Sequence, residues 1–363
     1  MTKLYSLLVL FFAITLFSGC GSDGDDPELQ APTNLVVNAT VSTDGSGEVT
    51  FAATADGETY YEFAFGDAAF FTPQNVRNGS VVHVYEESGD YTVTVKAFTN
   101  KDLFITATKD ITVDVFINIP ATGYSTPEEY PNMVSYWTQE FDEPLNEDEW
   151  TFELGGGGWG NQELEYYRKQ NTSVVDGHLV ITAKAESVGA NNYTSSRIIT
   201  KDKKTFQYGR IDVRAALPKG KGIWPAIWML GNNIGTQPWP KCGEIDIMEM
   251  IGGAANEKTV YGTAHYDNGG HEMNGGQYDL PTGILADKFH VFTIIWTEDM
   301  ITWYIDDIKY HELPITATRT EFQEEFFFVL NVAVGGNWPG PPDDTLKFPQ
   351  RMIIDYIRVF KPE

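Results

Sequence analysis

The chain has 363 residues, enough for two domains behind a leader, and its 25 Lys and Arg against 51 Asp and Glu give a formal net charge of −26. This charge argues against a polyanion such as nucleic acid as the partner, and against highly sulfated polysaccharides as substrates. Aromatic residues form 13% of the chain, with 9 Trp and 18 Tyr, and their flat rings suit the apolar faces of neutral sugars.

The first residues form a targeting segment rather than part of a fold. Lys3 precedes an apolar run over 4–17 that is short for a membrane span and ends in Ser18-Gly19-Cys20. This ending resembles a bacterial lipoprotein cleavage box, although Phe17 stands where an aliphatic residue is usual. We expect a signal peptide over 1–19, lipid on Cys20, and an acidic tether over 20–31 that leads to the outer membrane and the cell surface. An ordinary signal peptide cleaved nearby is the alternative.

Short apolar or alternating segments separated by turn residues follow over 32–117 and predict a small β-sandwich. Phe65-Gly66-Asp67 and Gly89-Asp90-Tyr91 resemble a PKD domain, which implies an Ig-like spacer or a sugar-binding module. Segment 118–131 is rich in Pro and Gly and is interpreted as a linker.

Strands dominate again from residue 132 to residue 363, and no long helical period is found. This pattern predicts an all-β domain built as a large two-sheet sandwich. The expected strands span 179–183, 209–215, 227–230, 244–250, 260–265, 290–296, 301–305, 326–332 and 353–360.

The most unusual segment is Glu244-Ile245-Asp246-Ile247-Met248-Glu249, where three acids interrupt an apolar strand. Acidic residues are depleted in strands, and a carboxylate buried without a partner is costly. Strand alternation places Glu244 and Asp246 on one face and Glu249 on the other. One extra residue in a β-bulge, Ile247 or Met248, would return Glu249 to the face of the other acids.

Two glutamates on one strand face are the equipment of glycoside hydrolysis, in which a carboxylate attacks the anomeric carbon and a carboxylic acid protonates the leaving oxygen. Retention requires the two carboxyls to lie about 5–5.5 Å apart. Asp246 would hydrogen-bond Glu244 and help to separate the two pKa values. A solvated edge strand with surface acids, or a calcium site with unusual acid spacing, are the alternatives.

The surrounding residues carry a family resemblance. Trp224-Pro225-Ala226-Ile227-Trp228-Met229-Leu230 and Trp239-Pro240-Lys241-Cys242-Gly243, together with the acidic strand, resemble the signature of glycoside hydrolase family 16. Within that family the chain is similar to the laminarinase-like branch, whose active strand carries the extra bulge residue. Further motifs of this branch match residues 159–167, 195–200, 208–210, 331–340 and 355–359.

The resemblance implies a concanavalin-like β-jelly roll with the active strand on a concave face, and no catalytic cofactor. It implies that Glu244 is the nucleophile, Glu249 the general acid/base, and Asp246 the residue that assists the nucleophile. Sugar-binding residues are also expected, each with an ordinary core, loop or surface role as the alternative. They are Trp224, Trp228, His265, Asn161, Arg197, Trp239 and Trp338.

Many family members carry a structural calcium on the convex side. The resemblance places the Asp355 carboxylate there, with the backbone carbonyls of Glu140 and Gly177, while an ordinary strand-end acid is the alternative reading of Asp355. If Cys20 is lipidated, Cys242 is left alone, and we expect it to be a small buried side chain rather than a nucleophile.

These observations predict a surface-anchored, endo-acting, retaining hydrolase of neutral β-1,3-glucan (laminarin), with mixed β-1,3/1,4-glucan as a further substrate. The alternatives are a family member that cleaves galactans or host glycans, and a transglycosylase. A non-catalytic sugar-binding protein is least favoured, because both glutamates are present. We expect a monomer, although nothing in the sequence specifies the oligomeric state.

Overall fold

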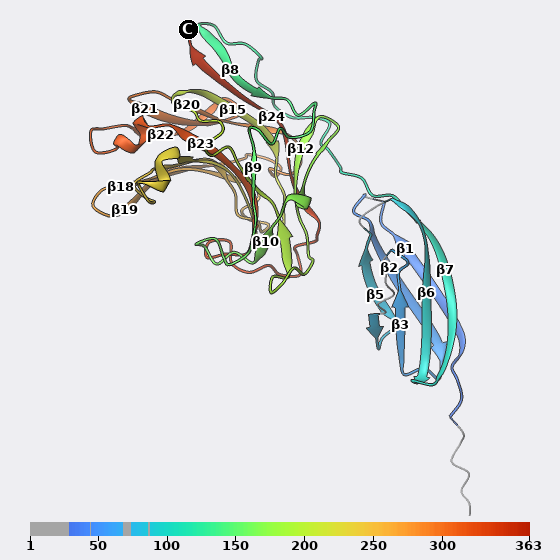
Figure 1. The fold of residues 1–363 in the computed structure, drawn as a ribbon. Helices are drawn as coiled ribbons and strands as arrows, with labels where there is room; N and C mark the ends of the chain where they lie inside the picture. Colours follow the sequence, from blue (N-terminus) through green and yellow to red (C-terminus); the bar gives the residue numbers. More distant parts are fainter. Residues whose placement is uncertain (1–28, 44, 68–73, 86–87) are drawn as a thin grey trace, which may run out of the picture. The chain divides into compact units, whose positions relative to one another are not determined.

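The structure, a computed structural model, describes residues 29–43, 45–67, 74–85 and 88–363. Cys20, the expected signal peptide and most of the acidic tether lie outside these residues. The chain divides into two compact units, Met1–Phe116 and Ile117–Glu363, and strands are the main regular structure of each (Figure 1). Among the described residues, no helix is long and apolar enough to cross a membrane.

The first unit is a sandwich of two antiparallel sheets, with strand orders β1-β2-β5 and β4-β3-β6-β7. Phe51, Phe63 and Tyr85 are fully buried and form much of its core. The predicted Ig-like sandwich is confirmed. Its strands are β1 (Thr33–Val41), β2 (Glu48–Asp56), β3 (Tyr60–Ala64), β4 (Gln74–Val76), β5 (Ser80–Val84), β6 (Gly89–Asn100) and β7 (Leu103–Val113).

The second unit is a larger sandwich, as predicted. Its eight-stranded sheet has the order β11-β12-β24-β15-β20-β21-β22, with β8 also paired to β24. These strands are β8 (Met133–Gln139), β11 (Thr172–Val175), β12 (His178–Ala183), β15 (Gly209–Ala216), β20 (His290–Trp296), β21 (Met300–Ile305), β22 (Ile308–Pro314) and β24 (Gln350–Pro362).

The seven-stranded sheet has the order β19-β18-β17-β16-β23-β14-β9. Its strands are β9 (Thr151–Glu153), β14 (Arg197–Ile199), β16 (Ile223–Gly231), β17 (Glu244–Glu249), β18 (Thr259–Asp267), β19 (His271–Asp279) and β23 (Phe326–Val334). A short parallel pair, β10 (Glu165–Tyr167) and β13 (Tyr193–Ser195), and the 3-10 helices η1 (Lys169–Asn171), η2 (Asn232–Gly235) and η3 (Thr320–Gln323) complete the unit.

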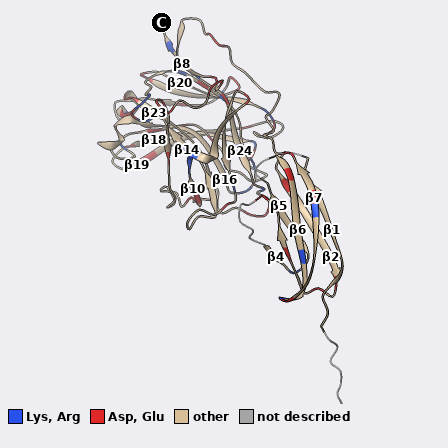
Figure 2. Ribbon diagram, turned by 45° about the vertical axis from the view of Figure 1, so that its right-hand side comes forward, with Lys and Arg blue, Asp and Glu red and all other residues tan. Residues whose placement is uncertain are grey.

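One large hydrophobic core lies between the two sheets and holds the acidic strand in place. Ile245, Ile247 and Met248 of β17 are fully buried in it. Each such side chain contributes about 1.5–3 kcal/mol, which offsets part of the cost of the acids beside them. Strands β16 and β23, which follow β17 on one side in the sheet order, carry no charged residue (Figure 2), so the acids of β17 are exceptional in this part of the sheet.

Segment 118–131, interpreted from its sequence as a linker, is instead bound to the second unit. Ile117 and Ile119 pack against a cluster that includes Val180 and Phe289. Gly123 forms a bridge with Phe289, and the next residue donates its backbone N–H to the Phe289 carbonyl at 3.0 Å. The segment therefore forms a strap along the eight-stranded sheet.

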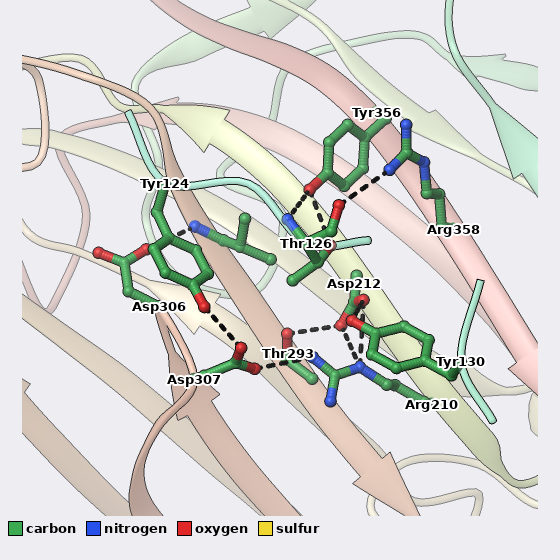
Figure 3. Close-up of polar contacts among 11 residues, drawn as sticks. Tyr124, Thr126, Tyr130, Arg210, Asp212, Thr293, Asp306, Asp307, Tyr356 and Arg358 are labelled. Carbon is green, nitrogen blue, oxygen red and sulfur yellow. Dashed lines mark hydrogen bonds and ion pairs between the residues drawn. The ribbon is translucent and has the colours of Figure 1, made fainter. Parts of the chain in front are cut away.

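Polar contacts hold the rest of this strap (Figure 3). The hydroxyl of Tyr130 donates to the fully buried Asp212 at 2.8 Å, and Asp212 also accepts hydrogen bonds from Arg210 and Thr293. The linker interpretation is wrong because Pro and Gly report local backbone conformation, whereas these partners come from distant parts of the chain. Further contacts are Tyr124 to Asp307 (2.6 Å) and Thr126 N to Tyr356 Oη (2.9 Å).

Candidate active site

Strand β17 changes register between Asp246 and Glu249. Against β16, Asp246 lies opposite Trp228, and Glu249 lies opposite Ala226, so that Ile247 has no partner residue there. The pairing with β18 shifts at the same place. The predicted bulge is confirmed, and it places the three carboxyls on the face of the sheet that points away from the core.

The strand register sets functional side chains in one row across this face. Glu249 on β17 lies opposite Tyr261 on β18 and Ala226 on β16, and Ala226 in turn lies opposite Asn331 on β23. Arg197 on β14 continues the row, because it lies opposite Asn331. The small side chain of Ala226 lies between the carboxyl and the amide in this row.

The carboxyl of Glu244 is held from two sides. The indole N–H of Trp239 donates to it, with 3.0 Å between Nε1 and Oε2. His265 Nε2 lies 3.7 Å from Glu244 Oε1 and 3.2 Å from Asp246 Oδ2. Asp246 is 3% exposed, and its Oδ2 has no hydrogen bond of good geometry, so the His265 contact is electrostatic. The side chain of Glu244 keeps 17% of its surface and can reach a substrate.

Glu249 has a matching arrangement on the other side of the bulge. The indole N–H of Trp224 donates to it, with 3.0 Å between Nε1 and Oε1. Trp338 packs edge-on against Trp224, with ring centroids 5.6 Å apart, and against Tyr261, with centroids 5.0 Å apart. Trp338 is also 41% exposed. The three rings form an aromatic group beside Glu249 that suits contact with sugar faces.

Burial raises the pKa of all three carboxyls. The pKa of Glu249 rises to about 8, mainly because protein surrounds the carboxyl, and the charge of Asp246 adds to the rise. Burial also raises the pKa of Glu244 and of Asp246, and repulsion from Asp246 acts on Glu244. Burial alone therefore does not separate nucleophile from acid. The contact of His265 with Glu244 opposes the rise there and favours ionisation of Glu244.

Arg197 lies between two indole rings. Its guanidinium carbon is 4.8 Å from the ring centroid of Trp228 and 5.1 Å from that of Trp159, and its Nε donates to Glu153. Trp228 donates its own N–H to Asn331 at 2.7 Å. The edge of the Trp228 indole is therefore held by the hydrogen bond to Asn331, and its face is covered by the guanidinium of Arg197.

A chain of hydrogen bonds continues from Asn331, near the Arg197 end of the row of side chains. Asn331 donates to the hydroxyl of Tyr167 at 3.1 Å, and Tyr167 donates to Glu163 at 2.8 Å. Asn161, predicted to bind sugar, donates to the second oxygen of Glu163 at 3.1 Å. In this structure the amide of Asn161 therefore orients Glu163. Glu165, fully buried, accepts the backbone N–H of β23 at 2.6 Å, and burial raises its pKa well above the ordinary range.

The structure thus brings the predicted residues Trp224, Trp228, His265, Arg197, Trp239 and Trp338 to the same face as the acids, with Asn161 at its border. It adds residues that sequence reasoning missed. Asn331 was detectable, because it is a lone polar residue in an otherwise apolar strand. Trp159, Glu163 and Tyr167 lie in the matched motif 159–167, although no role was predicted for them. Tyr261 and His271 have no local signal, since their roles depend on contacts between different strands and loops.

The comparison with known proteins agrees with this geometry. Residues 133–358 match the family described as Glycosyl hydrolases family 16. The chain belongs to this family. As a family 16 protein it is a glycoside hydrolase, and a further match over residues 31–113 identifies a PKD domain in the first unit.

Three relatives of this family 16 enzyme illustrate the likeness. A Beta-glucanase of Rhodothermus marinus is 37% identical over 268 residues, which is 69% of this chain and 92% of that protein. Glucan endo-1,3-beta-glucosidase A1 of Niallia circulans is 35% identical over 66% of this chain, which spans 40% of the relative's length. The solved laminarinase catalytic domain from Thermotoga maritima MSB8 is 49% identical, with a TM-score of 0.60 over 64% of this chain and 99% of that one.

The expected calcium residues of this family 16 domain line one pocket at the eight-stranded sheet. Glu140, Gly177 and Asp355 lie there, and the other lining residues are Glu128, Thr138, Asp142, Asp176, His178 and Arg358. The lining is rich in oxygen ligands, which fits a calcium ion. The Asp355 carboxylate accepts a hydrogen bond from Arg214 and lies 3.3 Å from His178 Nε2. A calcium ion bound there would therefore share the Asp355 carboxylate with Arg214 and His178.

Cys242, just before the acidic strand, is fully buried and packs with apolar residues of the same sheet. Burial raises the pKa of its thiol to about 11, so the reactive thiolate is suppressed. This environment suits the small apolar side chain that the sequence predicts, and not a nucleophile.

Proposed function

We propose that this family 16 enzyme hydrolyses β-1,3-glucan chains at internal bonds, with retention of anomeric configuration. The observation that carries the proposal is the bulged strand β17, which sets Glu244, Asp246 and Glu249 on one face while Trp239 and Trp224 each hold one glutamate. A retaining enzyme needs two carboxyls beside one glycosidic bond, and the bulge supplies them from a single strand.

In the first step, ionised Glu244 attacks the anomeric carbon and forms an ester bond to it. The bond between this carbon and the glycosidic oxygen breaks, and the proton of Glu249 goes to that oxygen, so that the departing chain leaves as an alcohol. The raised pKa of Glu249, about 8, keeps this proton in place at neutral pH. His265 lies beside the reactive oxygen of Glu244, and the same imidazole nitrogen lies beside Asp246, so the imidazole links the two carboxyls.

In the second step, Glu249 is ionised and accepts a proton from a water molecule. The water oxygen attacks the same carbon, the ester bond to Glu244 breaks, and Glu249 regains its proton. Two displacements at one carbon restore its original configuration. A transglycosylase would differ only here, because a sugar hydroxyl would replace water.

The substrate assignment rests on charge, on aromatic side chains and on the named relatives. The chain carries a net charge of −26, and Trp224, Trp338 and Tyr261 offer apolar rings for a neutral pyranose. The three relatives described above are named as a beta-glucanase, a glucan endo-1,3-beta-glucosidase and a laminarinase. Strand β17 lies inside the sheet, with strands on both sides, which suits a polymer that passes across the face and is cut internally.

A polysaccharide panel tests this proposal. We expect laminarin to be cleaved fastest, mixed β-1,3/1,4-glucan more slowly, and agarose, carrageenan and cellulose hardly at all. Glu244→Gln and Glu249→Gln should each lower the rate on laminarin by more than about 100-fold. Faster cleavage of a galactan or a mucin-type glycan would contradict the substrate assignment, and products longer than the substrate would indicate a transglycosylase.

We also propose that the enzyme is anchored at the outer cell surface by lipid on Cys20. The proposal rests on the cleavage box at Ser18-Gly19-Cys20 and on the acidic segment that follows it. Cys20→Ala should move the enzyme from the membrane fraction to the soluble fraction without changing its specific activity. A variant that stays with the membranes would contradict the anchor.

A further inference from the structure

Two histidines of neighbouring strands are in direct contact beside the nucleophile. His265 Nδ1 lies 2.8 Å from His271 Nε2, and the two rings are nearly parallel, with an interplanar angle of 15°. The other ring nitrogen of His265 faces Asp246 and Glu244. His265 therefore connects an exposed histidine with the catalytic carboxyls, and His271 has no role in the mechanism described above.

The hairpin of β18 and β19 explains why the two rings meet. Asp267 pairs with His271, and His265 pairs with Met273, so His265 and His271 are diagonal neighbours on one face. Such diagonal pairs lie within reach of each other when the side chains are aromatic. The ring of Trp239 covers His271 with 4.5 Å between centroids, and the same indole holds Glu244. The contact between His265 and His271 is therefore supported by the strand pairing and by the ring of Trp239.

Only one proton fits between the two nitrogens. If His265 Nδ1 carried it, neutral His265 would turn the bare lone pair of Nε2 toward Asp246, 3.2 Å away, and the two would repel. If His271 Nε2 carries it, His265 carries its own proton on Nε2, the nitrogen that faces the carboxyls. Burial lowers the pKa of His271, which favours the neutral form of this ring that the role requires.

We propose that His271 is a positioning residue for the hydrolytic reaction, which donates Nε2–H to His265 and thereby fixes His265 in the tautomer that carries its proton on Nε2, the nitrogen beside Asp246 and Glu244. The second nitrogen of a functional histidine commonly sets its tautomer in this way. This inference rests on the proposed roles of Glu244 and Asp246, but not on the identity of the polysaccharide.

Two substitutions separate a tautomer effect from a packing effect. His271→Ala removes the donor, and we expect kcat to fall roughly fivefold to tenfold, the equivalent of one lost hydrogen bond, with little change in KM. His271→Gln keeps an N–H at a similar distance and should retain most of the wild-type kcat. The matched control is Glu272→Gln, one residue along β19 and on the opposite strand face, and it should leave kcat unchanged.

Nitrogen-15 NMR of the full-length enzyme without substrate reads the tautomer directly. We expect His265 to be protonated at Nε2 in the wild type and in His271→Gln, and to become a mixture of both tautomers in His271→Ala. An unchanged kcat or an unchanged His265 tautomer in His271→Ala would overturn the proposal. It would also be overturned if His271→Gln were as impaired as His271→Ala. An enzyme that failed on laminarin but showed these NMR shifts would contradict only the substrate assignment.

Discussion

Trp224 donates its indole N–H to Glu249, with 3.0 Å between the nitrogen and the carboxyl oxygen. The indole N–H favours the ionised carboxylate, and so it limits the rise in pKa that burial causes. Trp224 therefore tunes the acid/base in addition to offering an apolar ring beside it.

The variant Trp224→Phe keeps a ring at this position and removes the donor. Without the bond the pKa of Glu249 should rise further above about 8. The alkaline limb of the kcat/KM profile should then move to higher pH by about one unit, because this limb reports loss of the Glu249 proton. Trp338→Phe is the matched control, since Trp338 packs on Trp224 through its ring edge. A limb that stays in place or moves to lower pH in Trp224→Phe would contradict this role.

Glu249 also makes stability depend on pH. Its pKa is raised from 4.5 to about 8 in the folded protein, so between these pH values the folded state binds more protons than the unfolded state. The free energy of unfolding should therefore fall as pH rises through this window. Glu249→Gln cannot ionise, and we expect its Tm to exceed that of the wild type by several degrees at pH 8 and by little at pH 4.5, at about 2–4 °C per kcal/mol. Scanning calorimetry checks this, with exposed Glu272→Gln as the control. A Tm gain that did not grow with pH would argue against a raised pKa.

The strap predicts a difference between two truncations. Every residue assigned to the chemistry lies beyond the first unit, so a chain that starts at Asn118 should keep the kcat of the full-length enzyme on a soluble oligosaccharide. A chain that starts at Asn132 loses Tyr130, a donor to the fully buried Asp212, and should unfold at least about 3 °C earlier. Tyr130→Phe in the full chain isolates this bond. Equal Tm values for the two truncations would show that the strap adds no stability.

Calcium should stabilise the enzyme without taking part in catalysis. We propose that Asp355, with the carbonyls of Glu140 and Gly177, holds one ion in the pocket at the eight-stranded sheet. Excess Ca²⁺ should then raise the Tm and a chelator should lower it, while kcat at 25 °C stays the same. Asp355→Asn should lose this response, and Mg²⁺ should not replace Ca²⁺. A Tm that does not change when Ca²⁺ is added would contradict the proposed calcium site.

The active strand was predictable because its acidic residues stand among apolar residues that favour a buried strand. Three acids in an apolar strand require a reason. Strand alternation would place Glu249 on the opposite face, so a shared site needs a bulge, and the register shift at Ile247 bears this out. Runs such as 326–332, apolar except for Asn331, likewise predict β23 within two residues. Short or half-exposed strands such as β9, β10 and β19 were missed, because their residues do not alternate clearly.

The missing parts of the site depend on contacts that the sequence does not encode locally. Tyr167 reaches Asn331 across 164 positions, and Arg197 reaches Glu153 across 44. His271 became visible only when the β18–β19 register placed it diagonal to His265. The strap was mistaken for a linker for the same reason, since its Pro and Gly residues say nothing about the distant side chains that bind it.

The anomeric configuration of the first product tests the central claim most directly. In a double displacement on a β-1,3-linked glucan, Glu244 attacks the sugar and Glu249 acts first as acid and then as base. Proton NMR of laminarin, recorded in the first minutes after the full-length enzyme is added, should show the β-anomer at the new reducing ends before the α-anomer accumulates by mutarotation. An initial α-anomer would contradict the double displacement, and no new reducing ends on laminarin would contradict the substrate.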